Sequence, residues 1–219
     1  MRQNKNIKIL NSSFYNRDAQ VVAKELLGKV IFHKYKKMWL AVQIIETEAY
    51  YLKEKGSHAS LGYTEKRKAL FMPPGTIYMY YARGKDSFNI STKGEGNAVL
   101  IKSGYPYKDA EIYNEMIKIM QKLNSLKNKL KPIEKLCSGQ TLLCTSLNLR
   151  VGDWDKKQFR KNELYIADTG YKPEKIIQTS RLGIPKDRDP HLLFRFIDYN
   201  YVRFCSKNIN NSTRYAILS

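Results

Sequence analysis

Cysteine and histidine are both scarce in this sequence, with three of each among 219 residues. The cysteines, Cys137, Cys144 and Cys205, are odd in number and lack the paired spacing of a metal site, which is typical of free, buried thiols in a reducing compartment. Three histidines are too few for a multi-histidine metal centre. We therefore expect a protein without disulfides, bound metal or cofactor.

Long apolar runs and acidic residues are also in short supply. No segment approaches transmembrane length, and the first eleven residues are basic and polar without the apolar core of a signal peptide, so we expect a cytoplasmic protein with no segment inserted in a membrane. Asp and Glu number 20 against 39 Lys and Arg, which gives a net charge of +19. Such an excess predicts a polyanionic partner, either a nucleic-acid backbone or an anionic membrane surface.

The length fits one domain, and we expect residues 1–219 to form it without a linker. Apolar residues at helical spacing predict an amphipathic helix from Asp18 to Leu27, which Gly28 ends. The apolar run from Met38 to Ile45 predicts a buried strand that leads directly into Glu46 and Glu48. Residues 1–13 are expected to form a basic N-terminal arm.

The middle of the chain predicts a β-meander with a hairpin. We expect its elements at Thr76 to Tyr81 (strand), Arg83 to Asp86 (hairpin tip), Ser87 to Thr92 (strand), Gly94 to Gly96 (turn) and Ala98 to Lys102 (strand). Later segments are predicted as a helix over Lys108 to Leu123, a mobile basic loop over Ser125 to Lys135, a short helix capped by Ser138 and running to Leu147, and a β-rich segment over Leu192 to Phe204.

The chemistry is expected where the buried strand ends. Residues two apart on an extended chain share a face, so Glu46, Glu48 and Tyr50 should project together. The carboxylate of such a pair can activate water and oppose positive charge at a sugar carbon, while the ring can stack on a planar base. Taken alone, acidic residues at strand ends are more often solvated or bound to arginine.

Several longer motifs occur in a specific order. Their letters are IIETEAY (Ile44 to Tyr50), SHAS (Ser57 to Ser60), FMPPGTIYMYY (Phe71 to Tyr81), FNIS (Phe88 to Ser91) and GEGNAVLI (Gly94 to Ile101), with weaker matches ELLGK (Glu25 to Lys29), LCSG (Leu136 to Gly139), SRLGI (Ser180 to Ile184) and LLFRF (Leu192 to Phe196). In this order they closely resemble the alkyladenine (3-methyladenine) DNA glycosylase family. The matches extend over nearly the whole chain.

The resemblance implies a fold and an activity. The fold is mixed α/β (α+β), a single domain with a curved, mainly antiparallel sheet, flanking helices and a protruding β-hairpin that wedges into DNA. The implied activity is removal of alkylated purines such as 3-methyladenine, ethenoadenine and hypoxanthine, which are flipped from double-stranded DNA before the N-glycosidic bond is hydrolysed. A nucleoid-associated monomer that is monofunctional and leaves an abasic site is expected.

The resemblance also assigns roles to residues of this sequence. Glu48 is implied to be the general base and Leu182 to offer its backbone carbonyl to the attacking water, with Lys102 in the place of a water-contacting arginine. The base site is implied to consist of Tyr50 and Tyr80 as a stacking pair, His58 as a further wall and edge reader, and Asn89 as the residue that excludes the guanine amine. Glu46 is expected to make structural contacts.

The sequence departs from the family at several of these places. Arg83 occupies the hairpin position where family members commonly have an intercalating tyrosine, and Lys102 keeps the charge of an arginine but not its bidentate fork. The segment Thr64 to Leu70, TEKRKAL, lacks the usual arginine-asparagine pattern. A catalytically weakened homologue that acts as a DNA-binding protein is therefore the main alternative.

Two other enzyme classes are weaker alternatives. A carbohydrate glycosidase would use Glu46 and Glu48 as paired carboxylates, but residues two apart on one strand stand side by side and do not flank a sugar. A metal nuclease built on the same glutamates would need further convergent carboxylates, which the neighbouring sequence lacks.

Overall fold

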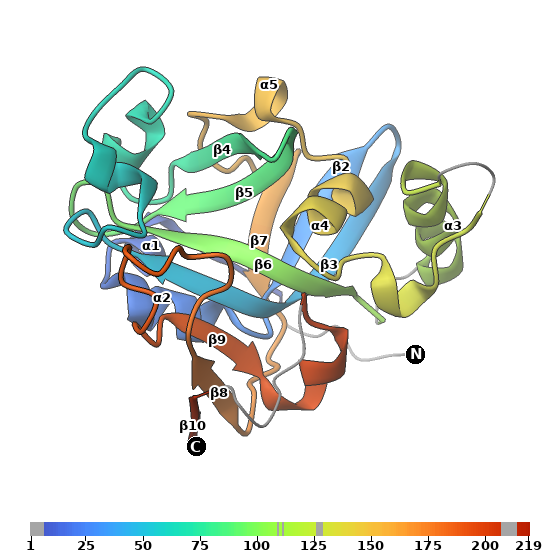
Figure 1. Cartoon of the computed structure of the whole chain (residues 1–219). Helices are drawn as coiled ribbons and strands as arrows, with labels where there is room; N and C mark the ends of the chain where they lie inside the picture. The colour runs from blue at the N-terminus through green and yellow to red at the C-terminus, as the bar shows by residue number, and fades with distance from the viewer. Residues whose placement is uncertain (1–6, 109, 111, 126–128, 207–213) are drawn as a thin grey trace.

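A computed structural model describes residues 7–108, 110, 112–125, 129–206 and 214–219, and over these residues ten strands form one antiparallel sheet (Figure 1). The strands are β1 (Lys8–Ile9), β2 (Val30–Tyr35), β3 (Met38–Tyr50), β4 (Ile77–Ala82), β5 (Lys85–Ser91), β6 (Ala98–Pro106), β7 (Leu164–Asp168), β8 (Ile176–Thr179), β9 (Arg195–Asp198) and β10 (Tyr215–Leu218). With its helices, this sheet confirms the mixed α/β fold that the sequence predicts.

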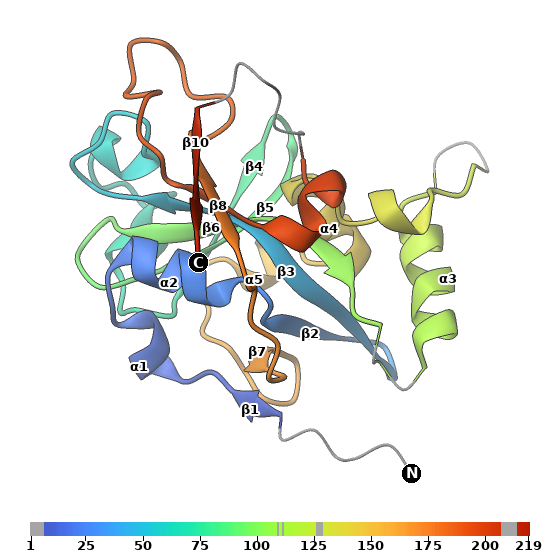
Figure 2. The same ribbon diagram turned by 90° about the horizontal axis from the view of Figure 1, so that it is seen from below.

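The central strand β3 is where the sheet branches. β6 pairs along one edge of β3, whereas the other edge is shared by two strands: β2 pairs with its first half and β9 with Glu46 to Glu48. One arm of the sheet then continues through β7 to β1, and the other through β8 to β10 (Figure 2). The second half of β3 therefore lies between β6 and the C-terminal strand β9.

β3 is longer than the sequence predicted. The expected strand ended at Ile45, but β3 continues through Glu46 and Glu48 to Tyr50, so both glutamates lie within the strand and not after it. A charged residue usually marks the end of a buried strand because burial of an unpaired charge is costly. Here each glutamate has a cation beside it, Arg195 for Glu46 and Lys102 for Glu48, and this allows the strand to continue.

Helices cover both faces of the sheet. The α-helices are α1 (Ser12–Tyr15), α2 (Ala19–Leu26), α3 (Tyr113–Leu123), α4 (Gln140–Leu147) and α5 (Val151–Trp154), and the 3-10 helices are η1 (His58–Leu61), η2 (Lys68–Phe71), η3 (Ile133–Lys135) and η4 (Tyr199–Phe204). Figures 1 and 2 show α2 and α4 on opposite faces of the sheet. Thr47 faces α2 and donates to the carbonyl of Ala23 at 2.8 Å. Glu46 and Glu48, which alternate with Thr47, therefore point to the face that α4 covers.

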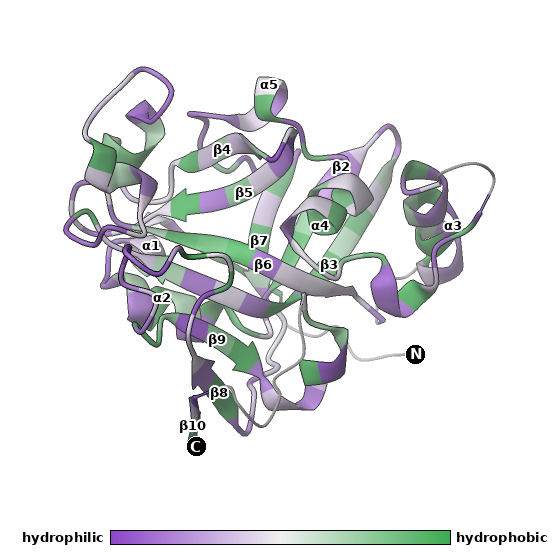
Figure 3. Ribbon diagram, viewed as in Figure 1, coloured by the Kyte–Doolittle hydropathy of each residue, from purple (hydrophilic) through white to green (hydrophobic). Residues whose placement is uncertain are grey.

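The core forms where the predicted amphipathic segments meet the sheet. The predicted helix over Asp18 to Leu27 is confirmed as α2, whose N-cap Asp18 accepts from the amides of Gln20 and Val21. Its apolar side packs against apolar residues of β3 and β6 in one large buried cluster. Figure 3 shows hydrophobic residues along most of β3 and β6, interrupted by polar positions. Polar residues in a buried sheet indicate a candidate functional site.

The predicted hairpin is present and its turn is tighter than expected. β4 and β5 pair from Ile77 with Ile90 to Ala82 with Lys85, which leaves only Arg83 and Gly84 in the loop. Both loop residues have positive φ, +53° and +76°, as a two-residue type I′ turn requires. Lys85 and Asp86, predicted at the tip, already belong to β5.

Two local predictions were wrong in their details. Ser138 does not cap α4: Gly139 occupies the cap position, and the Ser138 hydroxyl donates to the carbonyl of Cys205 at 2.8 Å. The segment from Leu192 to Phe204 is strand only over β9, after which the Asp198 side chain caps the 3-10 helix η4. At Ser138 the deciding contact is with the distant Cys205, and after β9 it is the cap that Asp198 provides.

The predicted arm and loop fall partly outside the described residues. Of the expected arm over residues 1–13, the structure describes residues 7–13, and Lys8–Ile9 pairs with β7 as an edge strand. Of the expected loop over Ser125 to Lys135, residues 126–128 lie outside the described part, and Ile133–Lys135 forms η3. The predicted helix over Lys108 to Leu123 begins only at Tyr113. No helix in the described part of the chain combines the length and the apolar character needed to cross a membrane.

Candidate active site

A pair of register shifts between β3 and β6 brings the candidate residues to one face. Leu100 lies opposite Glu48 and Ile101 opposite Thr47, but the next residue of β3, Glu46, pairs with Ser103. Lys102 is thus the extra residue of a β-bulge. A bulge re-aims side chains, and here Lys102 and Ser103 both reach the glutamate face, Lys102 to Glu48 and Ser103 to Glu46.

Glu48 is fully buried, and both of its carboxylate oxygens have partners. Oε2 accepts from the Tyr50 hydroxyl at 2.6 Å. Oε1 accepts from the backbone N–H of Leu182 at 3.3 Å and lies 3.3 Å from Lys102 Nζ. Lys102 provides the countercharge that a buried carboxylate needs.

Glu46 is held in a different way and makes the structural contacts predicted for it. Its Oε1 accepts from Arg195 Nε at 2.6 Å and from the Ser206 hydroxyl at 2.8 Å, while Oε2 accepts from Ser103 and from the Ser206 amide. Ser103 in turn accepts from the amide of Gly139 at 2.9 Å. Four donors hold Glu46, one of them a buried arginine, and Arg195 and Ser103 do not line the cavity, whereas the partners of Glu48 do; this argues against Glu46 as a second catalytic carboxylate and against the carbohydrate glycosidase alternative.

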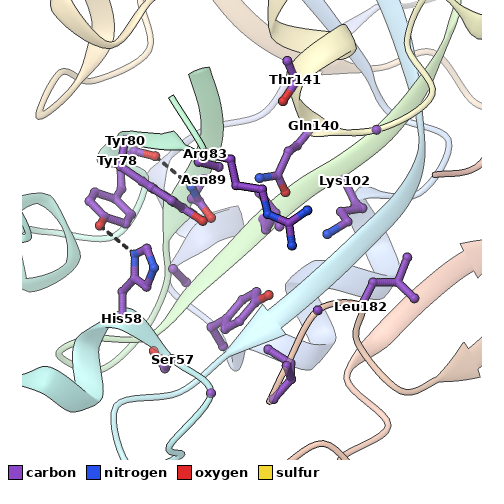
Figure 4. A pocket seen from close by; sticks show the side chains of 18 of the residues that line it. Ser57, His58, Tyr78, Tyr80, Arg83, Asn89, Lys102, Gln140, Thr141 and Leu182 are labelled. Atoms are coloured by element: carbon purple, nitrogen blue, oxygen red, sulfur yellow. Dashed lines mark hydrogen bonds between the residues drawn. The ribbon is translucent and has the colours of Figure 1, made fainter. Parts of the chain in front are cut away.

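A cavity of about 1030 Å³ opens above Glu48. Its lining includes Tyr50, His58, Tyr78, Tyr80, Arg83, Asn89, Lys102, Gln140, Leu182 and Arg188. All the site residues predicted from the sequence, apart from Glu48 itself, therefore meet in one cavity. Figure 4 shows His58, Tyr78 and Tyr80 on one side, with Lys102 and Leu182 across from them.

Aromatic rings form one wall of this cavity. The ring centroids of Tyr78 and Tyr80 lie 5.4 Å apart in a stacked arrangement, and the His58 ring meets the Tyr80 ring at 4.4 Å with an angle of 61°. His58 Nδ1 also lies 3.2 Å from the Tyr78 hydroxyl (Figure 4). The wall presents π-faces and edges to the cavity, which suits a planar heterocycle.

Ionisation of these rings follows from their burial. Burial, together with the charges of Arg67 and Arg188, lowers the pKa of His58, so the imidazole is neutral at physiological pH. Burial, followed by the adjacent Glu48, raises the pKa of Tyr50 well above its ordinary range. The Tyr50 hydroxyl therefore remains a proton donor toward Glu48 at any physiological pH.

Asn89 lies on β5 and lines the cavity. Its side-chain nitrogen donates to the carbonyl of Tyr78 at 3.1 Å and to the Ser87 hydroxyl at 3.2 Å. The amide is thus fixed in orientation by the hairpin that carries it. A fixed polar group is able to exclude one substrate edge and accept another.

Arg83 lies at the hairpin turn, where its backbone is strained. A positive φ is costly for a residue with a Cβ, and type I′ turns favour Asn, Asp and Gly at this position. The side chain is exposed and extends over the cavity, on the side facing Lys102 (Figure 4). The hairpin is anchored close to its turn because Asp86 accepts from the Val151 amide at 2.8 Å and lies 3.4 Å from Arg150.

Some residues that shape the site escaped the sequence analysis. Arg181 and Glu54 form a buried ion pair behind Tyr50, and Gln140 and Arg188 line the cavity. The motif SRLGI predicted a role for Leu182 and none for its neighbour Arg181. The partner of Arg181 lies 127 positions away, so no local pattern indicates the pair.

The three cysteines are free and buried, as predicted. Burial raises the pKa of the Cys137 thiol to about 12, so it is protonated and unreactive at physiological pH. Within the described residues, no group of three or more His, Cys, Asp or Glu side chains is arranged to hold a metal ion.

Comparison with known proteins gives consistent matches. The model of the family described as methylpurine-DNA glycosylase (MPG) matches residues 13–201. A protein of Pseudomonas syringae pv. tomato described as "Putative 3-methyladenine DNA glycosylase" is 58% identical over 200 residues, 91% of this chain and 90% of that protein. Proteins with the same description from Pseudomonas aeruginosa and Clostridium botulinum are 55% and 37% identical, over 91% and 80% of this chain and 84% and 87% of theirs.

Proposed function

Since the chain belongs to the methylpurine-DNA glycosylase family, we propose that it flips alkylated purines out of duplex DNA and hydrolyses their N-glycosidic bond. One observation carries this proposal: a buried glutamate with a compensating lysine lies directly beneath a cavity walled by aromatic rings. The proposed substrates are 3-methyladenine, ethenoadenine and hypoxanthine. The relatives' descriptions name the first of these as their substrate.

The proposed base site lies between Tyr50 and the aromatic wall. Tyr50 and Tyr80 both line the cavity, so a flipped purine would stack between them with His58 at its edge. Stacking on an aromatic ring stabilises a bound base by about 1–3 kcal/mol. This gain offsets the few kcal/mol that base flipping costs, and flipping is easiest for a damaged base. Asn89 would exclude the exocyclic amine of guanine.

In the proposed chemical step Glu48 acts as the general base. It would take a proton from a water that attacks the anomeric carbon, while its charge stabilises the developing oxocarbenium ion. The Leu182 carbonyl and Lys102 would orient this water. General-base catalysis contributes about 10²–10⁴-fold, which suits a reaction whose leaving group is already activated by alkylation.

The product is proposed to be an abasic site with an intact strand. A bifunctional enzyme would need an amine free to attack the sugar, whereas Lys102 Nζ is engaged with Glu48 at 3.3 Å. The attacking group would be water, and the purine would leave with the electrons of the broken C–N bond. We further propose that the enzyme acts as a monomer at the nucleoid.

Base release is the direct test. Duplexes that contain 3-methyladenine, ethenoadenine or hypoxanthine are incubated with excess protein, and the free base is measured by chromatography together with alkali-labile abasic sites. We expect free base from at least one lesion, with strand breaks only after alkali treatment. Binding without base release from any lesion would overturn the proposal and favour the alternative, a catalytically weakened homologue that acts as a DNA-binding protein.

A further inference from the structure

Two consecutive residues of the C-terminal half, Arg181 and Leu182, contact three consecutive residues of β3. The Leu182 amide donates to Glu48 Oε1 at 3.3 Å, and Arg181 Nη1 donates to the carbonyl of Ala49 at 3.1 Å. The guanidinium carbon of Arg181 also lies 4.5 Å from the centroid of the Tyr50 ring. One dipeptide thus holds the candidate base, the backbone after it and the candidate stacking ring.

The contact between Arg181 and Tyr50 lies behind the ring as viewed from the cavity. Tyr50 lines the cavity. Arg181 is buried and is not among the described residues that line it. The same guanidinium lies 5.5 Å from the Phe194 ring, so its planar group packs between two aromatic side chains. A planar cation stacked on a ring fixes the tilt of that ring.

A buried anion balances the charge of Arg181. Glu54 accepts from both Nη1 and Nη2 of Arg181 in a bidentate arrangement, and it also accepts from the Tyr51 amide at 2.8 Å. The ion pair therefore supports Tyr50 without placing an unbalanced positive charge behind a base that can itself be cationic. A bidentate pair also has one preferred geometry, unlike a lysine at the same place.

We propose that Arg181, oriented by Glu54, is a positioning residue that holds the Tyr50 ring at the tilt required for stacking on a flipped base. The inference rests on the proposed function because it assigns Tyr50 the stacking role. Arg181 does not touch the substrate and acts only through Tyr50 and the β3 backbone. Its loss should therefore impair capture of the flipped base, and displacement of a reactive group by about 1 Å costs on the order of 10²-fold.

A double-mutant cycle tests the inference. Arg181→Lys is made in the parent and in a Tyr50→Leu background, and each protein is assayed by quenching of ethenoadenine fluorescence in duplex DNA and by single-turnover base release. In the parent, we expect Arg181→Lys to weaken both signals by about ten-fold to a hundred-fold. In the Tyr50→Leu background, the same change should have little further effect, because the ring that Arg181 positions is already gone.

Two further variants keep the test independent of folding. Arg181→Met combined with Glu54→Gln removes both charges, so neither is left unpaired in the interior, and it should behave as Arg181→Lys does. Arg195→Lys alters a similarly buried arginine that pairs with Glu46, and its effect should be the same with Tyr50 or Leu at position 50.

The outcomes separate the two proposals. If Arg181→Lys causes equal losses in both backgrounds, its role is general stability and the positioning role is overturned. The parent could instead quench ethenoadenine fluorescence but release no base, with the quenching lost in Arg181→Lys and in Tyr50→Leu. The proposed hydrolysis then fails while the positioning role stands.

Discussion

The hydroxyl of Tyr50 donates a 2.6 Å hydrogen bond to Oε2 of Glu48, two residues earlier on the same strand. The residue proposed to stack on the base is therefore hydrogen-bonded directly to the residue proposed to activate water. Because the strand geometry fixes both side chains on one face, a shift of the ring also shifts the carboxylate. Stacking and chemistry are coupled through this one contact, and point variants can separate them.

Tyr50→Phe should keep stacking and impair chemistry. The variant retains the ring and its packing on Arg181 but removes the donor to Glu48. Hydrogen bonds to charged groups contribute about 1.5–3 kcal/mol, so we expect single-turnover base release to fall by about ten-fold or more with binding nearly unchanged. Equal loss of rate and of ethenoadenine quenching would show that the hydroxyl serves stacking instead.

Glu48→Gln should abolish turnover and leave DNA binding intact. Glutamine preserves size but not the charge or basicity that water activation needs, and these matter only in the chemical step. We expect single-turnover rates to fall by about 10²–10⁴-fold, with affinity for abasic-site DNA within a few-fold of the parent. Normal base release from this variant would remove Glu48 from the role of base.

Glu46→Gln is the matched change two residues away and should have the opposite signature. Glu46 is fully buried and paired with Arg195, so its neutralisation breaks a buried ion pair. Breaking such a pair costs about 3–5 kcal/mol, which should appear as a lower unfolding midpoint in urea. Activity below that midpoint should be affected far less than in Glu48→Gln.

Arg83→Asn should weaken action on duplex more than on single-stranded DNA. Asparagine suits the positive φ of the turn, so the hairpin is retained and only the proposed wedge is lost. A wedge fills the gap left by the flipped nucleotide, and a single strand has no such gap. Arg83→Tyr is the complementary variant and should raise duplex activity. Equal losses on both substrates in Arg83→Asn would contradict the wedge assignment.

DNA affinity should depend steeply on salt. With a net charge of +19, the chain should bind DNA largely through phosphate contacts, each of which contributes a slope of about −0.9 to the logarithm of affinity against the logarithm of salt. Anisotropy titrations of an undamaged duplex between 50 and 200 mM salt, about the range over which such contacts are resolved, measure this slope. A flat profile would contradict binding through the backbone.

His33 should make stability depend on pH below neutrality. Its Nδ1–H faces the Leu147 carbonyl at 2.6 Å, and its Nε2 accepts from the Trp154 indole at 3.2 Å, so the buried ring is neutral. Burial lowers its pKa in the folded state. The unfolded chain then binds more protons, and stability should fall as the pH drops below about 6.5. Melting temperatures at pH 7.5 and 5.5 should differ less in His33→Gln than in the parent.

The sequence predicted elements whose signals are local. The cap Asp18 and the stop Gly28 bound α2, and the alternation around Arg83 and Gly84 placed the hairpin. Spacing alone indicated Tyr50 beside Glu48, and the family resemblance supplied the other residues that meet in the cavity. Local patterns failed where a distant residue determines the structure. Ser138 donates to Cys205 and does not cap α4, and β3 continues past Ile45 because its glutamates have distant partners.

The long-range pairs were beyond prediction for a physical reason. A buried charge is tolerated only next to its partner, but the partner can come from any part of the chain. Arg195 and Arg181 approach β3 because β9 and the loop before it pack along its free edge, and that branch depends on the whole topology. The register shift that aims Lys102 at Glu48 likewise arises from pairing between strands.

The branch of the sheet at β3 has a consequence for how the protein is made. The environment of Glu46 and Glu48 is completed by Leu182, Arg195 and Ser206, which the ribosome adds more than a hundred residues after β3. Until they emerge, a nascent chain carries two glutamates that it cannot bury. The proposed catalytic centre can therefore close only after residue 206 has left the ribosome, so a nascent chain that ends before it would not be able to cleave a base.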